Sequence, residues 1–343
     1  MKYIFYLFVL LLLSTCVEQL EFTSDELEDV VVVDGYFSAA EGIKTVRLTR
    51  TTKVNSQLVE SISGAKVCVE DDAGTLIPFV ETGQGVYQTE ARANDQKQYR
   101  LNVELPDGRK VNSTFQRVPD SVSIAAINIV DTLVTFLNES GNTQRLRALE
   151  FFANANLGSS DEDLFLRFST QTVYQVLETV CGPFHTPKAC YFYNDERPFD
   201  INLIEIDQGV EPSQIESMVL RREINYQLAE IFALELSLLS YNEEEFDYWR
   251  RLKQLFEQQG NINDVNPARL VGNMASEDGF EVLGLFAVVG ESRKIKLVRN
   301  SDFPTRRIPF CGIPENRPWP LPDACCDCLN LSGASLLKPD YWP

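Results

Sequence analysis

Histidine is almost absent from this sequence, which contains only His185. A Ser-His-Asp triad, or a metal site with several histidine ligands, would have to be built around this one residue. His185 lies between Cys181 and Cys190 in a segment with two prolines, where we expect a surface position. Motifs typical of a phosphate loop, a dinucleotide site, a nucleophile elbow or an EF-hand are also missing. We therefore expect neither histidine-based catalysis nor a metal ion.

Acidic residues are plentiful, but no two of them stand out as a catalytic pair. The runs Asp161–Asp163 and Glu243–Glu245 are typical of solvated faces or helix starts. A glycosidase needs two carboxylates about 5 to 10 Å apart across a cleft, and the sequence singles out none. The sequence thus predicts a protein that is not an enzyme and carries no cofactor.

Basic residues are in the minority: 31 Lys and Arg stand against 50 Asp and Glu, for a net charge of −19. Nucleic-acid binding requires clustered Lys and Arg to neutralise phosphates. This balance argues against a nucleic-acid partner.

Apolar runs long enough to span a membrane, about 20 residues, are missing as well. The run from Tyr3 to Leu13 follows Lys2 and has the length of a signal-peptide core. Leu13-Ser14-Thr15-Cys16 then resembles a lipobox, although Thr15 departs from the usual Gly, Ala or Ser. We expect residues 1–15 to be a lipoprotein signal peptide and Cys16 to become the lipidated first residue, with enough acyl chains, such as palmitate, for stable anchoring. The alternative is an ordinary signal peptide with an incidental cysteine.

The next segment, residues 16–29, is polar and acidic and is expected to be a flexible tether. From residue 30 to 118 apolar residues alternate with polar ones, which is typical of strands. Pro106-Asp107-Gly108 joins two such runs and predicts a hairpin turn. Short strands at this spacing predict an immunoglobulin-like β-sandwich over 30–118, with Pro119 at its boundary.

Residues 119–343 are predicted to form a second β-rich domain. Strand patterns cover Ile124–Leu133, Arg147–Ala153, Leu164–Thr170, Ile201–Ile206, Ile224–Leu239, Phe280–Val289 and Lys294–Val298. One amphipathic helix is expected at about 241–259, because Phe246, Trp249, Leu252 and Phe256 fall on one helical stripe. Ser240 and Glu243 have the spacing of a capping box at its start.

Cysteines gather in the second half, and an exported chain would use them as disulfides. Cys68 is alone in a strand pattern and is expected to be a free, packed thiol. Cys181 and Cys190 enclose a short loop and are expected to pair with each other. The Pro- and Cys-rich C-terminal segment contains Cys311, Cys325, Cys326 and Cys328. Two disulfides of unknown connectivity are expected there, because their spacing does not fit the usual zinc knuckle.

Two further features carry weak predictions. Trp319 and Trp342 in the tail could bind a sugar or a partner's pocket, or they could pack against the domain. Asp120-Ser121-Val122 and Asp131-Thr132-Leu133 resemble a short O-glycosylation motif of Bacteroidota.

Taken in order, several segments resemble the Bacteroidota outer-membrane lipoproteins grouped as domain of unknown function 4249. The departures from that pattern are Thr15 and the extra vicinal cysteine at Cys325-Cys326. The matching segments are Val31–Tyr36, Ser63–Val67, Tyr248–Leu252, Pro267–Asn273, Cys325–Cys328 and Pro339–Trp342.

The resemblance implies a partner, because such lipoproteins are typically encoded beside TonB-dependent outer-membrane transporters. It implies a non-catalytic accessory or substrate-binding lipoprotein of such a β-barrel. In these lipoproteins, acidic residues after the lipidated cysteine favour surface export, so we expect a lipid-anchored outer-membrane protein facing the cell surface, with the periplasmic face left open. The alternative is a stand-alone surface glycan-binding or adhesin lipoprotein.

Overall fold

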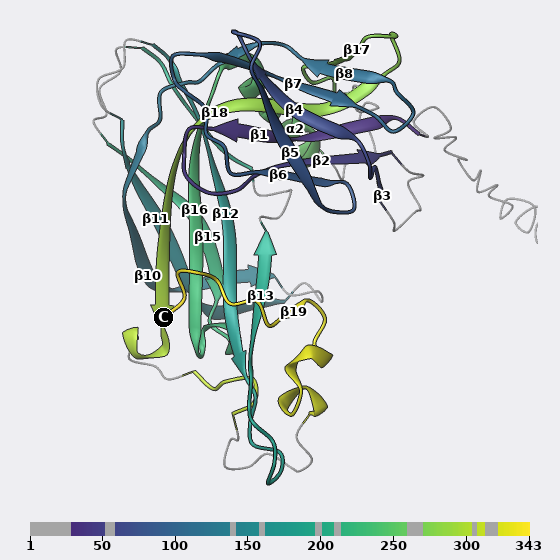
Figure 1. The fold of residues 1–343 in the computed structure, drawn as a ribbon. Coiled ribbons are helices and arrows are strands. Elements are labelled where there is room, and N and C mark those ends of the chain that lie inside the picture. The colour runs from purple at the N-terminus through teal and green to yellow at the C-terminus, as the bar shows by residue number, and fades with distance from the viewer. Residues whose placement is uncertain are drawn as a thin grey trace, which may run out of the picture.

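The computed structural model describes residues 29–51, 59–137, 142–157, 162–195, 201–208, 214–258, 270–303, 307–312 and 322–343. The expected signal peptide, Cys16, nearly all of the tether and Trp319 lie outside these ranges. The predicted fold class is confirmed: the described chain is mainly β, with one α-helix. None of the described helices is long and apolar enough to cross a membrane. Figure 1 shows two β-rich parts whose strands run in different directions.

The first part is a β-sandwich built mostly from residues 30–118. Its two sheets are joined by β5, whose first half pairs with β4 and whose second half pairs with β6. Alternation places Val67 and Val69 in the core and leaves Cys68 half-buried on the other face. The strands are β1 (Val31–Ser38), β2 (Lys44–Arg50), β3 (Glu60–Ser61), β4 (Lys66–Asp71), β5 (Leu76–Gly83), β6 (Val86–Thr89), β7 (Gln98–Glu104), β8 (Lys110–Ser113) and β9 (Gln116–Arg117).

The predicted hairpin turn is confirmed between β7 and β8. The Leu105 amide donates to the Arg109 carbonyl at 2.8 Å, and Gly108 has a φ of 88°. A positive φ of this size is accessible to glycine at little cost. The Arg109 amide also donates to the Asp107 side chain at 3.0 Å, which is the local bond expected of aspartate in a turn.

The second part is a sandwich of longer strands. β10, β11 and β15 form one sheet, which faces the sheet around β12 and β16. Phe151 and Phe232, both fully buried, contact each other between the sheets with ring centres 5.9 Å apart. The strands are β10 (Ser123–Leu137), β11 (Thr143–Asn156), β12 (Leu164–Leu177), β13 (Ala189–Asp195), β14 (Asn202–Ile206), β15 (Gln214–Glu223), β16 (Ile231–Tyr241) and β19 (Ala334–Ser335).

One long strand, β18 (Val282–Arg299), belongs to both parts (Figure 1). Its first half pairs in parallel with β1, from Val31 opposite Val282 to Ser38 opposite Val289. Its second half pairs antiparallel with β16. The short β17 (Met274–Ser276) also pairs with β8 of the first sandwich. The first sandwich therefore takes strands from beyond residue 270, which a division of the chain at 118 leaves out.

The change of partner along β18 occurs at Gly290. A Cβ atom at this position would lie 2.5 Å from the carbonyl oxygen of Pro119, closer than atoms can approach. Glycine is therefore required for the segment that connects the two sandwiches to pass over β18 at this point. The connecting segment is therefore in close contact with β18 at Pro119, the residue that was expected to mark the boundary between the two parts.

The predicted amphipathic helix is observed as α2 (Glu243–Gln258). Phe246 is buried and packs on Phe165 of β12, with ring centres 5.3 Å apart. The predicted cap at Ser240 is wrong, because β16 continues to Tyr241 and keeps Ser240 buried in the sheet. Strand pairing along β16 thus extends past the position at which local spacing suggested a helix start.

Candidate functional site

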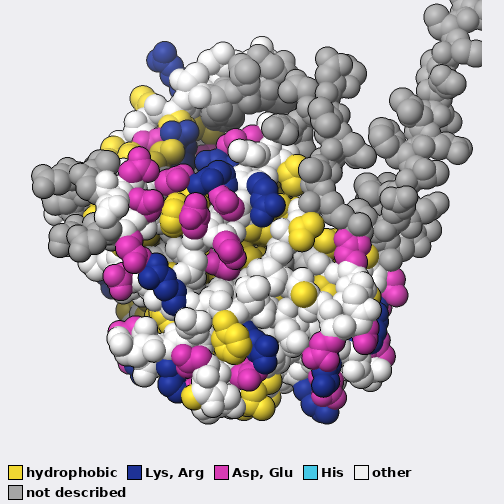
Figure 2. All heavy atoms as spheres, turned by 90° about the horizontal axis from the view of Figure 1, so that it is seen from above, with side chains coloured by type: hydrophobic (Ala, Val, Ile, Leu, Met, Phe, Trp, Pro, Cys, Tyr) yellow, Lys and Arg dark blue, Asp and Glu magenta, His cyan; other side chains and the backbone are white. Residues whose placement is uncertain are grey.

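A cleft of about 820 Å³ lies at the junction of the two sandwiches. The first sandwich contributes residues of β1 and β2, the second contributes residues of β12, β16 and β18, and helix α2 forms the third wall. Pockets of this size at domain junctions are common sites for small ligands. Figure 2 views the molecule from the end formed by the first sandwich, where acidic and basic side chains are interspersed. Because acidic and basic side chains are mixed on this face, the cleft is a stronger candidate for a binding site than the face is.

The junction beside the cleft is held by Glu291, whose side chain is fully buried. Its carboxylate accepts hydrogen bonds from Ser38 at 2.6 Å, from Ser237 at 3.2 Å and from Tyr36 at 3.3 Å, and it pairs with Arg293. Burial raises the pKa of Tyr36 to about 12, Glu291 adds to this, and Arg293 opposes it. These bonds connect β1, β16 and β18, so the buried charge is satisfied and holds the two sandwiches together.

The helix wall of the cleft centres on Trp249. The guanidinium of Arg167, from β12, lies over its ring at 3.8 Å from the centre, and Tyr241 approaches it edge-on at 6.4 Å. A guanidinium over an indole face is a favourable cation–π arrangement. Sequence reasoning assigned Trp249 to a core stripe and did not single out Arg167. A lone arginine in the apolar run Leu164–Phe168 is the signal that could have found it.

The opposite wall contains Asp34 and Arg47. Their nearest charged atoms are 3.9 Å apart, and their side chains are 63% and 55% exposed. Water therefore reaches the Asp34 carboxylate, but the surrounding cleft walls raise its pKa by desolvation, which Arg47 and Arg167 oppose. Asp34 directly follows four valines, so a carboxylate here is a second signal in the sequence.

Glu245 is a buried residue of α2 and does not line the cleft. Burial raises the pKa of Glu245 to about 7, and the nearby Glu244 adds to the effect. One carboxylate oxygen is 3.4 Å from the Asn273 amide nitrogen, and the other has no hydrogen-bond partner. Asn273 in turn bonds both main-chain groups of Phe286 on β18, at 2.7 and 3.1 Å. The carboxyl group thus connects the helix with the shared strand.

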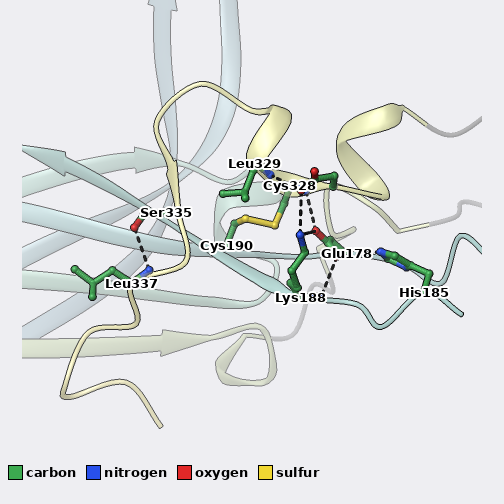
Figure 3. Close-up of a disulfide and its surroundings, with 9 residues drawn as sticks. Glu178, His185, Lys188, Cys190, Cys328, Leu329, Ser335 and Leu337 are labelled. Carbon is green, nitrogen blue, oxygen red and sulfur yellow. Dashed lines mark hydrogen bonds and ion pairs between the residues drawn. A yellow bond between two sulfur atoms is a disulfide. The ribbon is translucent and has the colours of Figure 1, made fainter.

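The far end of the second sandwich is a disulfide-stapled loop between β12 and β13 (Figure 3). Disulfide bonds were predicted, but the pairing of Cys181 with Cys190 is wrong. The expectation of two bonds within the C-terminal set is also wrong, because only Cys311 and Cys325 pair inside it. The observed bonds are Cys181–Cys326, Cys190–Cys328 and Cys311–Cys325.

The positions of the side chains explain this connectivity. Cys190 is fully buried on β13, whereas Cys181 lies in the exposed loop, so the two are held at different depths. The C-terminal segment forms two short turns, η4 (Asp323–Cys325) and η5 (Cys328–Asn330), between which Cys326 reaches the loop. Neighbouring cysteines can therefore bond to different parts of the fold, which spacing alone does not reveal.

Glu178 lies at the centre of this stapled end, with its side chain buried. Burial on its own would raise the pKa of Glu178, but hydrogen bonds from the Cys328 and Lys188 amides, at 2.9 and 2.8 Å, hold it below its ordinary value. His185, expected at the surface, is 23% exposed, and its Nε2 lies 3.2 Å from the Glu178 carboxylate. In Figure 3 the two side chains point toward each other. His185 thus helps to hold the loop, whose tip carries Phe184 with 99% exposure.

The remaining predicted residues are placed as follows. The binding prediction for Trp342 is wrong: it is 5% exposed, packs edge-on against Tyr191 and donates to Gln175 at 3.2 Å. Cys68 is a free thiol. Ser121 is exposed and Thr132 is half-buried on β10. Within the described ranges no group of three or more His, Cys, Asp or Glu side chains is arranged to hold a metal ion.

Comparison with known proteins assigns the chain to a family. No curated protein matches it significantly. The family model described as domain of unknown function (DUF4249) matches residues 17–295, which include the cleft, α2 and most of β18. The C-terminal cysteines and Trp342 lie beyond the matched region. The chain therefore belongs to the DUF4249 family.

Proposed function

We propose that this protein is a non-catalytic outer-membrane lipoprotein, anchored through Cys16, that binds a small ligand as the accessory of a TonB-dependent transporter. The observation that carries the binding role is the cleft of about 820 Å³ between the sandwiches. Its walls come from the first sandwich, the second sandwich and α2, so a bound molecule would contact all three. The lipobox-like sequence before Cys16 and the resemblance to lipoproteins encoded beside such transporters support the anchor and the partner.

The arrangement of the polar groups supports binding in preference to bond-breaking chemistry. Glu291 and Tyr36 bond to each other and to neighbouring strands, so they hold the walls in position. A preformed cleft with fixed walls loses little conformational entropy when a ligand enters.

The partnership is tested by extraction of the full-length tagged protein from its native membrane in a mild detergent, followed by affinity capture and mass spectrometry. We expect an outer-membrane β-barrel to co-purify in near-stoichiometric amount. Cys16→Ser is the matched control, because it removes the lipid site and should abolish membrane retention. Recovery of the wild-type protein as a monodisperse monomer would count against the proposal.

A second candidate is a stand-alone surface glycan-binding or adhesin lipoprotein. The aromatic residues Tyr36, Tyr241 and Trp249 along the cleft favour it, because such side chains commonly contact sugar rings. Trp319→Ala tests the tail, and Trp249→Ala tests the cleft, in a glycan-array measurement. An unchanged array signal in both variants would rule out this version. Trp342→Ala is unsuitable here, since that side chain is buried.

A further inference from the structure

We infer that helix α2 is a pH-dependent wall of the cleft: it packs against β18 while Glu245 is protonated, and it moves away when Glu245 ionises. This inference concerns the regulation of the cleft, so it rests on the proposed binding function. The features that carry it are the shallow burial of α2, the surroundings of the Glu245 carboxyl group and the position of the helix in the cleft wall.

Helix α2 is attached to the rest of the protein mainly at its first turn. Within residues 243–257 only Glu245 and Phe246 are buried, at 2% and 1% exposure, and the others are half-buried or exposed. An isolated helix of this length is marginal in water, so its stability depends on the packing of one face. Phe246 provides such packing against Phe165. The other buried residue is an acid, so its charge state affects how firmly the helix is held.

The Glu245 carboxyl group has few partners that could stabilise a negative charge. Its Oε1 lies 3.4 Å from the amide nitrogen of Asn273, which is long for a hydrogen bond, and its Oε2 has no partner. The same Asn273 nitrogen already donates to the Phe286 carbonyl at 2.7 Å. A buried carboxylate without a cationic partner costs far more free energy than the neutral acid. Ionisation therefore favours a state in which this group reaches water.

The groups that act most strongly on the charge of Glu245 include no cation. Burial raises the pKa of Glu245 to about 7, and the negative charge of Glu244 adds to the effect. The Glu245 main-chain amide and the side chains of Asn242 and Asn273 oppose it, but they do not outweigh burial. The neutral acid is thus the form that fits the closed arrangement.

Charged residues on the described elements around α2 are engaged elsewhere. Neither residues 282–289 of β18 nor residues 270–273 include an ionisable side chain. Arg167 of β12 stacks on Trp249, one turn further along the helix. Other charged groups around the helix have these partners: Asp34 of β1 acts on Tyr248, Arg250 pairs with Asp247 and Glu205, and Arg117 pairs with Glu162.

The residues that follow Glu245 on the same face of α2 form the helix wall of the cleft. Trp249, Leu252 and Phe256 succeed it at spacings of four, three and four residues, and all three line the cleft. A helix is a stiff element, so movement of its first turn away from β18 displaces these side chains as well. The released helix therefore makes weaker contact with a molecule bound in the cleft.

The pH range of the switch follows from the two states of the helix. In the released state Glu245 is solvated and titrates near its ordinary 4.5, whereas in the packed helix its pKa is about 7. Protonation therefore fully favours the packed helix below about pH 4.5, and this preference is lost as the pH rises through 7. Linkage between these values gives an increase of about tenfold in the ratio of released to packed helix from pH 6 to pH 8.

Hydrogen exchange of the full-length protein at pH 6 and pH 8 tests the movement without any ligand. After correction for the intrinsic pH dependence of exchange, residues 246–257 should lose about tenfold in protection at pH 8, while β7 keeps its protection. Glu245→Gln cannot ionise and should show no such loss. Glu243→Gln, which changes an exposed acid of the same turn, is the matched control and should behave as the wild type.

Binding of N-phenyl-1-naphthylamine measures the consequence for the cleft. This probe is uncharged at both pH values, so a change in its affinity reports on the protein. The wild type should bind it up to about tenfold more weakly at pH 8 than at pH 6, and Glu245→Gln should bind it equally at both. Leu252→Ser should weaken binding at both pH values, which locates the probe in the cleft. Asp34→Asn removes another carboxyl group of raised pKa and should keep the pH dependence of the wild type.

Unchanged corrected protection of α2 between pH 6 and pH 8 overturns the inference. So does a pH dependence that persists in Glu245→Gln and disappears in Asp34→Asn, because it would assign the switch to the opposite wall. Absence of probe binding at both pH values would count against the proposed binding of a small ligand, while hydrogen exchange still decides the movement of α2. The transporter partnership is judged separately by affinity capture, which uses neither measurement.

Discussion

The two sandwiches of this protein are stabilised in different ways. The first closes its core without a covalent bond: Val69, Tyr87 and Leu101 are at most 1% exposed, and Cys68 stays a free thiol. The second has a similar core near the junction, but its far end is held by three disulfides. That end contains short turns and the two-residue strand β19, which offer few ladder hydrogen bonds. Covalent bonds are thus concentrated where regular pairing is scarce.

The buried carboxylates follow the same division. At the junction Glu291 is satisfied by side chains of three strands alone, whereas at the stapled end Glu178 also accepts hydrogen bonds from main-chain amides, those of Lys188 and Cys328. The side chains of His185 and Lys188 add ion pairs to Glu178. The main-chain amides of a regular strand are used in hydrogen bonds to the neighbouring strands. Only irregular backbone therefore has amides that can donate to a buried carboxylate. The comparison shows how local regularity decides which groups can neutralise a buried charge.

The largest expected effect follows from removing the shared strand. A chain of residues 29–118 lacks β17 and β18 and should not fold cooperatively, because β1 loses its parallel partner and the core loses Phe286 and Val288. Joining residues 270–289 through a linker should restore a cooperative thermal transition and dispersed amide resonances. Val288→Asp in the joined chain is the control that should fail again. A cooperative transition of 29–118 alone would contradict the expected dependence on β18.

Removal of a disulfide is expected to weaken only the second sandwich. The double substitution Cys181→Ser and Cys326→Ser removes a bond between residues 145 apart in sequence. Because Cys190–Cys328 still joins the same two segments, the loop that is opened in the unfolded chain has only about a dozen residues, which is worth about 3 kcal/mol on the loop-entropy model. Hydrogen exchange should show lost protection at 178–190 and 322–343, with β7 of the first sandwich unchanged. Cys68→Ser, which breaks no bond, is the matched control. Equal loss of protection in both sandwiches would refute the conclusion that the disulfides stabilise only the second sandwich.

The pH dependence of stability tests the contact between α2 and the shared strand. Because the pKa of Glu245 is raised to about 7 from an ordinary 4.5, its contribution to stability is full below about pH 4.5 and is lost as the pH rises through 7. Glu245→Gln should match the wild type at pH 4.5 and be more stable at pH 8, by on the order of 3 kcal/mol. Urea unfolding at the two pH values measures this. Glu243→Gln, which changes an exposed residue of the same first helical turn, should show no such gain.

The smallest effect is expected at the tip of the stapled loop. Phe184 is 99% exposed, so Phe184→Ser should change the free energy of unfolding by less than about 0.5 kcal/mol. Phe192 on the adjacent β13 is 6% exposed, and Phe192→Ala should cost about 3 to 5 kcal/mol. Thermal unfolding of both variants gives the comparison. A large loss of stability in the Phe184 variant would show that the loop is held by more than its disulfides and Glu178.

Local patterns predicted the elements well, and tertiary relations poorly. Alternation found β4 and β7, and the stripe through Phe246 found α2, because both periods are set by the backbone of the element itself. The parallel pairing of β1 with β18 has no local signal, since it joins segments far apart in the chain. The same holds for the disulfide partners.

The cleft was missed for a related reason. Asp34 and Arg167 each interrupt an apolar run, so the sequence marks them as unusual for strands. What it does not contain is the meeting of β1, β12 and α2 at one place, which depends on how β18 joins the sandwiches. A charged residue inside an apolar strand is therefore a signal to record even when its neighbours in space are unknown.

The shared strand also constrains the order in which the chain can fold. Until residues 282–289 are available, β1 keeps an open edge, and its Val31-Val32-Val33 run is the kind of segment that pairs with other chains. Contacts between such distant segments form slowly. Strands β10 to β16, in contrast, follow one another within a single stretch of chain and can pair earlier. The sandwich that is synthesised first therefore cannot complete its sheet until most strands of the second have been made.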